Sequence, residues 1–92
     1  MRLVWSAGAE ADRLAIFQFA ESDSGFAAQA LDAAIEEGAD QLLDSPDMGR
    51  PGVVSDTREL AVHPNYRLIY DVAGDETRVL GIVHVRRQWP GE

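Results

Sequence analysis

The most constraining feature of the sequence is a change of hydrophobic period near its middle. Residues 44–52 read DSPDMGRPG, a proline- and glycine-rich composition that neither a helix nor a strand continues through. Before this segment apolar residues recur at spacings of three and four, and after it they alternate. The first pattern is typical of amphipathic helices and the second of strands. The chain therefore builds helices first and a sheet second, which is an α+β plan.

Cap and turn residues divide each half further. Residues 2–6 have strand composition and end in Ser6, a good N-cap for a helix over residues 7–21. Residues 22–25 interrupt that helix, and residues 24–43 form a second one. Three strand patterns follow at residues 57–63, 66–72 and 77–87, joined by short turns. The expected fold is an N-terminal strand, an antiparallel helical hairpin and a three-stranded antiparallel meander packed on the helices.

The same periodicities predict which side chains are buried. In the first helix they predict a wide buried face made of Leu14, Ile16, Phe17, Phe19 and Ala20 or Glu21. In the second helix they predict a buried stripe made of Phe26, Ala27, Ala30, Leu31, Ala34, Ile35 and Leu42. In the strand over residues 66–72, the side chains expected to face the helices are Tyr66, Leu68, Tyr70 and Val72. Arg67 is then expected on the open side. The last strand is apolar early and polar late, so it should emerge from the core at its C-terminal end.

Length and composition limit the class of protein. A chain of 92 residues has room for one modest core, so residues 1–92 are expected to form a single domain. It contains no cysteine, which excludes disulfides and thiolate metal sites. No apolar run approaches the roughly 20 residues of a membrane span, and the N-terminus lacks the pattern of a signal peptide. The sequence thus predicts a cytoplasmic protein without membrane association.

Charge is distributed unevenly along the chain. The net charge of −8 argues against non-specific binding of nucleic acid by the surface as a whole. Residues 1–47 hold two arginines and ten acids, whereas residues 48–92 hold six of each. Any anionic target should therefore contact the second half, where arginine is the sole cation because the chain has no lysine.

Motifs for common chemistries are missing from the sequence. It has no phosphate-binding glycine loop and no nucleophile elbow, and its two histidines, His63 and His84, lack His or Cys neighbours at metal-ligand spacing. We therefore expect no metal and no cofactor. His84 suits proton transfer near neutral pH, and it equally suits a hydrogen-bonded position at a sheet edge. Trp89 can anchor a partner or stack on a base, or it can fold back onto the core.

An arginine set remains, made of Arg50, Arg58, Arg67, Arg86 and Arg87. Arginine grips phosphate or carboxylate through two parallel hydrogen bonds and stays charged at any physiological pH. Each one taken alone is more simply explained as a surface residue or as the partner of Glu59 or Asp71. Arg67 is hardest to dismiss in this way, because apolar residues flank it within a strand.

These residues, in this order, resemble a known family. The stretches that carry the resemblance are GRPG at 49–52, TREL at 57–60, YRLIY at 66–70 and VLGIVHVRRQWP at 79–90. They are similar to the ParE/RelE superfamily of toxins from bacterial type II toxin–antitoxin systems, and the ending favours the ParE branch. The resemblance implies the RelE/ParE-like fold and a cognate antitoxin that forms a hetero-oligomer with the toxin. We expect an antitoxin helix in an apolar groove, with the acids of residues 24–43 meeting basic residues on it.

The resemblance also implies a target. ParE-type members poison DNA gyrase without being hydrolases, whereas RelE-type members cleave mRNA on the ribosome. For the nuclease, Arg67 matches the phosphate-binding arginine, His84 the acid and Arg50 a basic loop position. The family's carboxylate is absent where Gly52, Val53 and Val54 stand, and no tyrosine follows Val72.

These departures favour gyrase inhibition and a chain that is not an enzyme. The expected target-binding residues are Arg50, Arg58, Arg67, His84, Arg86, Arg87 and Trp89. A metal-independent endoribonuclease using Arg67 and His84 is the alternative. An inactive co-repressor that only binds its antitoxin is a third reading.

Overall fold

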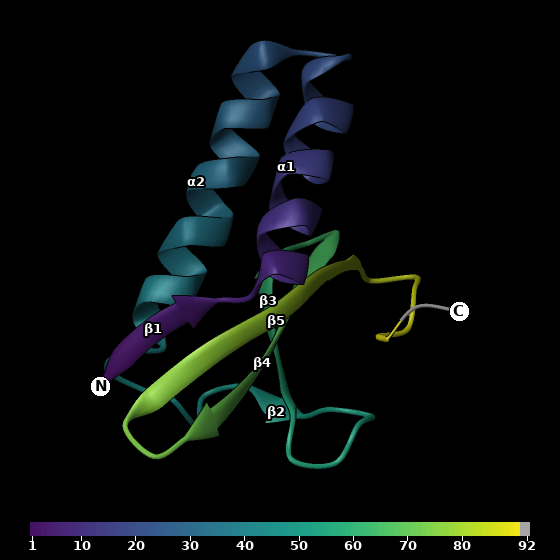
Figure 1. The fold of residues 1–92 in the computed structure, drawn as a ribbon. Coiled ribbons are helices and arrows are strands. Elements are labelled where there is room, and N and C mark those ends of the chain that lie inside the picture. The colour runs from purple at the N-terminus through teal and green to yellow at the C-terminus, as the bar shows by residue number, and fades with distance from the viewer. Residues whose placement is uncertain (91–92) are drawn as a thin grey trace.

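The computed structural model describes residues 1–90 and contains two helices and one five-stranded sheet (Figure 1). In chain order the elements are β1 (Arg2–Trp5), α1 (Ala7–Glu21), α2 (Gly25–Gln41), β2 (Arg50–Pro51), β3 (Arg58–His63), β4 (Tyr66–Ala73) and β5 (Glu76–His84). The predicted α+β architecture is confirmed. Strand β2 was not expected, because its two residues lie in the segment that reads as a loop.

Serine caps start both helices where the sequence places them. The Ser6 hydroxyl accepts a hydrogen bond of 3.0 Å from the backbone N–H of Ala9, and the Ser24 hydroxyl accepts one of 3.2 Å from Ala27. Each cap satisfies one of the backbone donors that the first turn of a helix leaves unpaired. The predicted helix starts are therefore right, and they fix where the chain leaves β1 and where it reverses.

The sheet places the two ends of the chain side by side. Its strand order is β1-β5-β4-β3-β2, with β1 parallel to β5 and every other pair antiparallel. Strand β1 covers only the first half of β5. Beyond β1, the backbone N–H of Ile82 donates to the Asp12 carboxylate of α1 at 3.0 Å. The opposite edge ends at β2, whose second residue is Pro51.

A bulge in β5 changes which side chains share a sheet face. Tyr70 pairs with Val79 while its neighbour Ile69 pairs with Gly81, so Leu80 is an extra residue in β5. Strict alternation along β5 would place Val79 and Ile82 on opposite faces, whereas the bulge puts Val79 opposite buried Tyr70. The interrupted alternation explains why β5 reads as apolar on both sides.

The predicted faces of β4 are partly right. Leu68 and Tyr70 are buried as expected, but Ile69 is buried as well, and Val72 is exposed at the end of the strand. The core cluster consists of Ala9, Ala39, Leu42, Leu68, Tyr70 and Val79.

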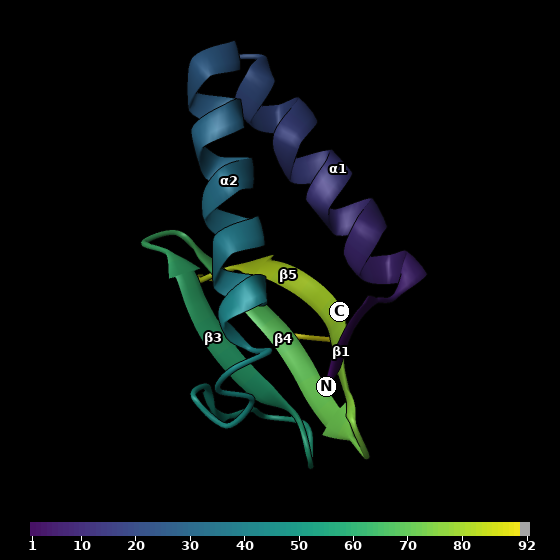
Figure 2. The same cartoon turned by 90° about the vertical axis from the view of Figure 1, so that its left-hand side faces the viewer.

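The helical hairpin stands on the sheet instead of lying flat across it (Figures 1 and 2). In the view of Figure 2 the helices converge at the tip and diverge toward the sheet. The wide buried face predicted for the first helix is therefore wrong. Leu14 is 58% exposed and Phe19 74%, and Phe26 at the start of α2 is 84% exposed. Phe19 and Phe26 lie near the tip of the hairpin, away from the core, whereas Leu14 lies in the middle of α1 beside a hollow that opens to solvent.

Helix α2 makes the closest helix–sheet contact. A Cβ added at Gly38 would lie 2.3 Å from Cγ1 of Val62 on β3. Glycine thus lets the helix backbone approach the strand more closely than any other residue would.

The loop before β3 is tied to the core by one hydroxyl. Tyr70 is fully buried, and its Oη accepts from the Gly49 N–H at 2.9 Å and donates to the Pro46 carbonyl at 2.8 Å. Burial raises the pKa of the Tyr70 hydroxyl above its ordinary value, opposed by the hydrogen bond from Gly49. This tie holds β2 in place beside β3.

Candidate functional site

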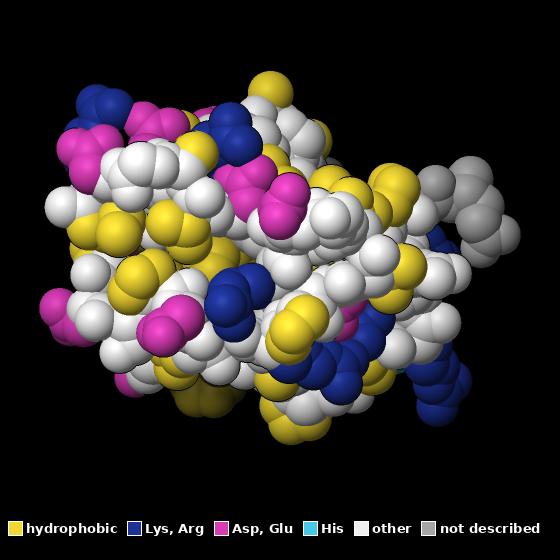
Figure 3. All heavy atoms as spheres, turned by 90° about the horizontal axis from the view of Figure 1, so that it is seen from below, with side chains coloured by type: hydrophobic (Ala, Val, Ile, Leu, Met, Phe, Trp, Pro, Cys, Tyr) yellow, Lys and Arg dark blue, Asp and Glu magenta, His cyan; other side chains and the backbone are white. Residues whose placement is uncertain are grey.

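The open face of the sheet gathers three of the predicted arginines. Arg50, Arg67 and Arg87 line a hollow of about 410 Å³ together with Glu59. They come from β2, β4 and the segment after β5, so residues far apart in the sequence meet here. Seen from below, arginine side chains gather on one side of this surface around a partly covered acidic side chain (Figure 3).

Glu59 is the electrostatic centre of this hollow. It is only 8% exposed, and its Oε1 lies 3.1 Å from Nη2 of Arg50 and 3.4 Å from Nη1 of Arg67. The Arg67 side chain is 18% exposed, so much of this pair is shielded from water. A buried carboxylate needs such partners, because its desolvation costs several kcal/mol when it is left alone.

Arg67 also holds the chain that follows β5. Its Nη2 donates to the backbone carbonyl of Arg87 at 2.8 Å. Its Nε is buried and has no hydrogen-bond partner within residues 1–90. The guanidinium therefore joins a buried acid to the C-terminal segment, which is a structural use of a residue expected to contact the target.

The remaining predicted site residues lie apart from this hollow. Arg58 donates to the carbonyls of Gly49 and Asp47, at 2.7 and 3.2 Å, and so ties down the loop. Arg86 is exposed. Trp89 is half-buried, and its indole lies where a Cβ at Gly81 would come within 2.5 Å of Nε1. Trp89 thus folds back on β5, one of its two expected uses.

His84 ends β5, three residues earlier than the predicted strand end at Arg87. Its ring packs edge-on against Tyr66 at 5.4 Å between centroids, and its Nδ1 accepts from the Arg86 N–H at 3.2 Å. In neutral His84 the ring proton is therefore on Nε2. A turn forms at this point, because the Arg87 N–H donates to the His84 carbonyl at 2.8 Å.

His84 and Arg67 do not converge. His84 pairs with Tyr66, whereas Arg67 is the next residue of β4 and pairs with Val83. Successive residues of a strand point to opposite faces, so these two side chains leave the sheet on opposite sides. They also line different hollows, Arg67 the one around Glu59 and His84 one of about 560 Å³ beside α1.

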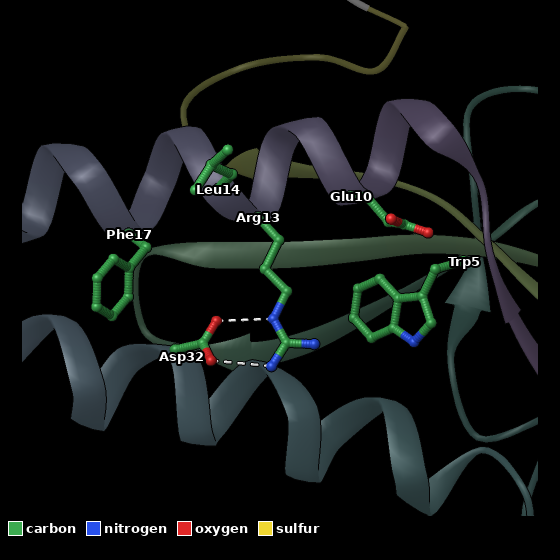
Figure 4. Close-up of a pocket in the computed structure, with 6 residues that line it drawn as sticks. All are labelled: Trp5, Glu10, Arg13, Leu14, Phe17 and Asp32. Carbon is green, nitrogen blue, oxygen red and sulfur yellow. Dashed lines mark hydrogen bonds and ion pairs between the residues drawn. The ribbon is translucent and has the colours of Figure 1, made fainter.

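A second hollow, of about 450 Å³, lies between the diverging helices (Figure 4). Arg13 of α1 reaches across it to Asp32 of α2 with two hydrogen bonds, of 2.7 and 2.9 Å. Its guanidinium also lies 5.0 Å from the centre of the Trp5 ring. The hydrogen bonds lower the pKa of the Asp32 carboxyl and raise that of Arg13. Leu14 and Phe17 supply apolar surface at its side.

Two absences apply to residues 1–90. No group of three or more histidine, aspartate or glutamate side chains is arranged to hold a metal ion there. Neither helix of that part of the chain has the length and apolar character that a membrane crossing requires.

A family model for "ParE toxin of type II toxin-antitoxin system, parDE" matches residues 3–89. The chain belongs to the ParE toxin family. "Toxin RelE2" of Caulobacter vibrioides is 34% identical over 86 residues, which cover 94% of this chain and 97% of the relative. "Putative toxin Y4kP" of Sinorhizobium fredii is 34% identical over 73 residues, 78% of this chain and 75% of the relative. The resemblance seen in the sequence is thereby confirmed.

Solved structures agree with this membership. A chain of the "Chromosomal ParDE TA system from P. aeruginosa" superposes with a TM-score of 0.83 at 28% identity, covering 92% of this ParE-family chain and 96% of that one. The "YoeB/ParE toxin from Agrobacterium tumefaciens" has a TM-score of 0.64 at 15% identity over 91% and 98% of the two chains, which supports the fold alone. The protein is a type II toxin of the ParE/RelE superfamily, and membership implies an antitoxin partner.

Proposed function

We propose that this ParE-family toxin inhibits DNA gyrase and contacts it through the segment after β5. The observation that carries the proposal is the separation of Arg67 from His84 on opposite faces of the sheet. Metal-free RNA cleavage requires an acid or base and a cation at one phosphate. Arg67 is held by Glu59 and His84 faces α1, an arrangement that supports gyrase inhibition over RNA cleavage.

The segment after β5 offers a different kind of contact. Arg86 and Arg87 are exposed at the end of the sheet, and neither is within ion-pair distance of an acid in residues 1–90. Two cations free to pair with a partner's carboxylates or phosphates suit recognition of a macromolecule. The chain as a whole has a net charge of −8, so these two arginines supply a local cationic site for an anionic target.

The test is plasmid supercoiling by purified gyrase as the toxin is titrated in. Inhibition that the cognate antitoxin reverses supports the proposal, and the variant Arg86→Ala/Arg87→Ala should then need far more protein for the same inhibition. The matched control, Arg2→Ala/Arg78→Ala, removes two exposed arginines elsewhere and should inhibit normally. Supercoiling that a growth-arresting preparation leaves intact would refute the proposal.

A ribosome-dependent endoribonuclease remains the second candidate, because one relative at 34% identity carries the name RelE2. His84→Gln separates the two activities. The nuclease should lose mRNA cleavage entirely in this variant, whereas the gyrase inhibitor should lose only the part of its potency that depends on the hydrogen bond from the Arg86 N–H to His84. Expression without the antitoxin tests the co-repressor reading, since growth arrest would exclude it.

We place the antitoxin on the hollow between the helices. Leu14 and Phe17 offer apolar surface to an amphipathic helix, and the exposed acids Glu10, Glu37 and Asp40 lie on the same two helices. Arg13 already pairs with Asp32 and, at 3.6 Å, with Glu36, so the remaining acids are those available to a basic antitoxin segment. Leu14→Glu should weaken antitoxin binding and leave gyrase inhibition unchanged.

A further inference from the structure

We infer that Glu59 and Arg67 are positioning residues that hold residues 85–89 in the conformation presenting Arg86 and Arg87 to the target. We call the contacts of Glu59 and Arg67 that hold this segment the clamp. Its functional consequence rests on the proposed gyrase contact, but the clamp itself can be measured without gyrase. Nothing in the sequence assigns this role, because Glu59 lies in β3 and the segment follows β5.

The clamp is a chain of three groups. The buried Glu59 carboxylate lies 3.4 Å from Nη1 of Arg67, and Nη2 of Arg67 donates to the Arg87 carbonyl at 2.8 Å. Because Glu59 is nearly inaccessible to water, its attraction for the Arg67 guanidinium is only weakly screened. The Arg87 carbonyl receives a charge-assisted hydrogen bond, the stronger class of such bonds.

Arginine is needed for this geometry. Its planar guanidinium places two nitrogens at a fixed separation, one toward the acid and one toward the carbonyl. A lysine ammonium is a single point of charge on a flexible stem. The substitution Arg67→Lys would therefore keep the charge beside Glu59 and lose the fixed second contact.

Short-range contacts complete the arrangement. The Val85 N–H donates to the Asn65 carbonyl at 2.9 Å, and the Arg86 N–H donates to His84 Nδ1 at 3.2 Å. These contacts shape the turn, whereas Arg67 ties its far end to the middle of the sheet. The side chains of Arg86 and Arg87 stay exposed while their backbone is held, so little ordering remains to be done on binding.

The first measurement is limited trypsin digestion of the folded toxin, with cleavage after Arg86 and Arg87 followed by mass spectrometry. We call the rate at which trypsin cleaves after Arg86 and Arg87 the trimming rate. Glu59→Gln and Arg67→Lys should each raise it several-fold. Asp71→Asn is the matched control for the lost acid, because Asp71 is also a strand carboxylate of low exposure (18%) but pairs with Arg78 instead of Arg67. It should be trimmed at the wild-type rate.

The second measurement is supercoiling by gyrase with the same variants. A loosened segment should raise the toxin concentration for half-inhibition about tenfold, equivalent to about 1.4 kcal/mol, while Asp71→Asn stays at the wild-type value. Thermal unfolding confirms that each variant is folded at the assay temperature. If Glu59→Gln unfolds because it leaves Arg67 without its acid, Arg67→Lys still decides the question.

The outcomes separate the clamp from the proposed function. A wild-type trimming rate in folded Arg67→Lys overturns the clamp. Faster trimming with undiminished gyrase inhibition overturns the role of the segment as the target contact. If the wild-type toxin leaves gyrase untouched, the proposed function fails, and the trimming rates still decide the clamp on their own.

Discussion

Replacing Tyr70 with phenylalanine tests whether one hydroxyl holds the loop against the sheet. The change removes two hydrogen bonds, to Gly49 and Pro46, and leaves the N–H of buried Gly49 without its acceptor. A net hydrogen bond contributes about 1 kcal/mol, and an unsatisfied buried donor costs about 1–3 kcal/mol. We expect the free energy of unfolding to fall by about 2–3 kcal/mol. In a domain of this size that lowers Tm by about 10–20 °C.

The same variant should change the pH dependence of stability. Burial raises the pKa of Tyr70 above the value of about 10 that it has in the unfolded chain. Above that pH the unfolded state loses its proton first, so it binds fewer protons than the folded state and the free energy of unfolding falls. The contribution is complete below about pH 10 and is lost as pH rises through the folded value. Tyr70→Phe has no hydroxyl to titrate and so lacks this loss. Its deficit, meaning the amount by which its free energy of unfolding is lower than that of the wild type, should therefore become smaller at alkaline pH.

Urea unfolding followed by circular dichroism measures both effects at neutral pH and in steps above pH 9. Tyr66→Phe is the control, because it removes the same atom from a side chain that is only half-buried. A Tyr70→Phe deficit below about 0.5 kcal/mol at pH 7 would refute the reasoning, since an exposed hydroxyl would cost as little. A deficit that is unchanged between pH 8 and pH 11 would refute the assignment of the alkaline loss to Tyr70.

Three further changes test the helices. Gly38→Ala should lower the free energy of unfolding by about 1–2 kcal/mol, since the new Cβ meets Val62 at 2.3 Å and overpacking outweighs the gain in helix propensity. The double variant with Val62→Ala should recover part of this loss in urea unfolding. If it recovers none, the loss does not come from a collision with Val62. Asp32→Asn should cost about 0.5–1 kcal/mol at pH 7. Because Arg13 lowers the folded pKa of Asp32, this cost should vanish as pH falls below about 4, and acid titration of both proteins shows whether the curves meet. Ser24→Ala removes the N-cap of α2 and should lower the free energy of unfolding by about 1 kcal/mol. Thermal unfolding followed by circular dichroism measures this, and an unchanged Tm would contradict it.

The sequence predicted the elements better than their burial. Serine caps and the proline-rich segment are local signals, so the helices and the three long strands appear within a few residues of their expected bounds. The exposure of Leu14, Phe19 and Phe26 depends on how the hairpin meets the sheet. Amphipathic spacing shows which side of a helix is apolar, and it carries no information on how far along that side the core extends.

The candidate site was predicted in composition and missed in arrangement. The sequence identified Arg50, Arg67 and Arg87 but treated Glu59 as an ordinary pairing partner, although it is the group around which they meet. The sequence did contain a signal for this role, because Glu59 lies within a predicted strand, where a buried charged residue needs a partner of opposite charge. The bulge at Leu80 could not be predicted from the alternation of apolar and polar residues, since both faces of β5 are apolar there.

The short outer strands of the sheet have a consequence for the free toxin. Exposed sheet edges are templates on which other chains can add strands, and aggregation often starts there. Here one edge ends in two residues that include Pro51, and the other is a four-residue strand that begins with Arg2. Where β5 extends past β1, Asp12 occupies the Ile82 N–H that another strand would need. The β1 edge therefore offers few backbone groups to an added strand, and residues 60–63 of β3, which extend past β2, are the stretch where another strand could add to the free toxin.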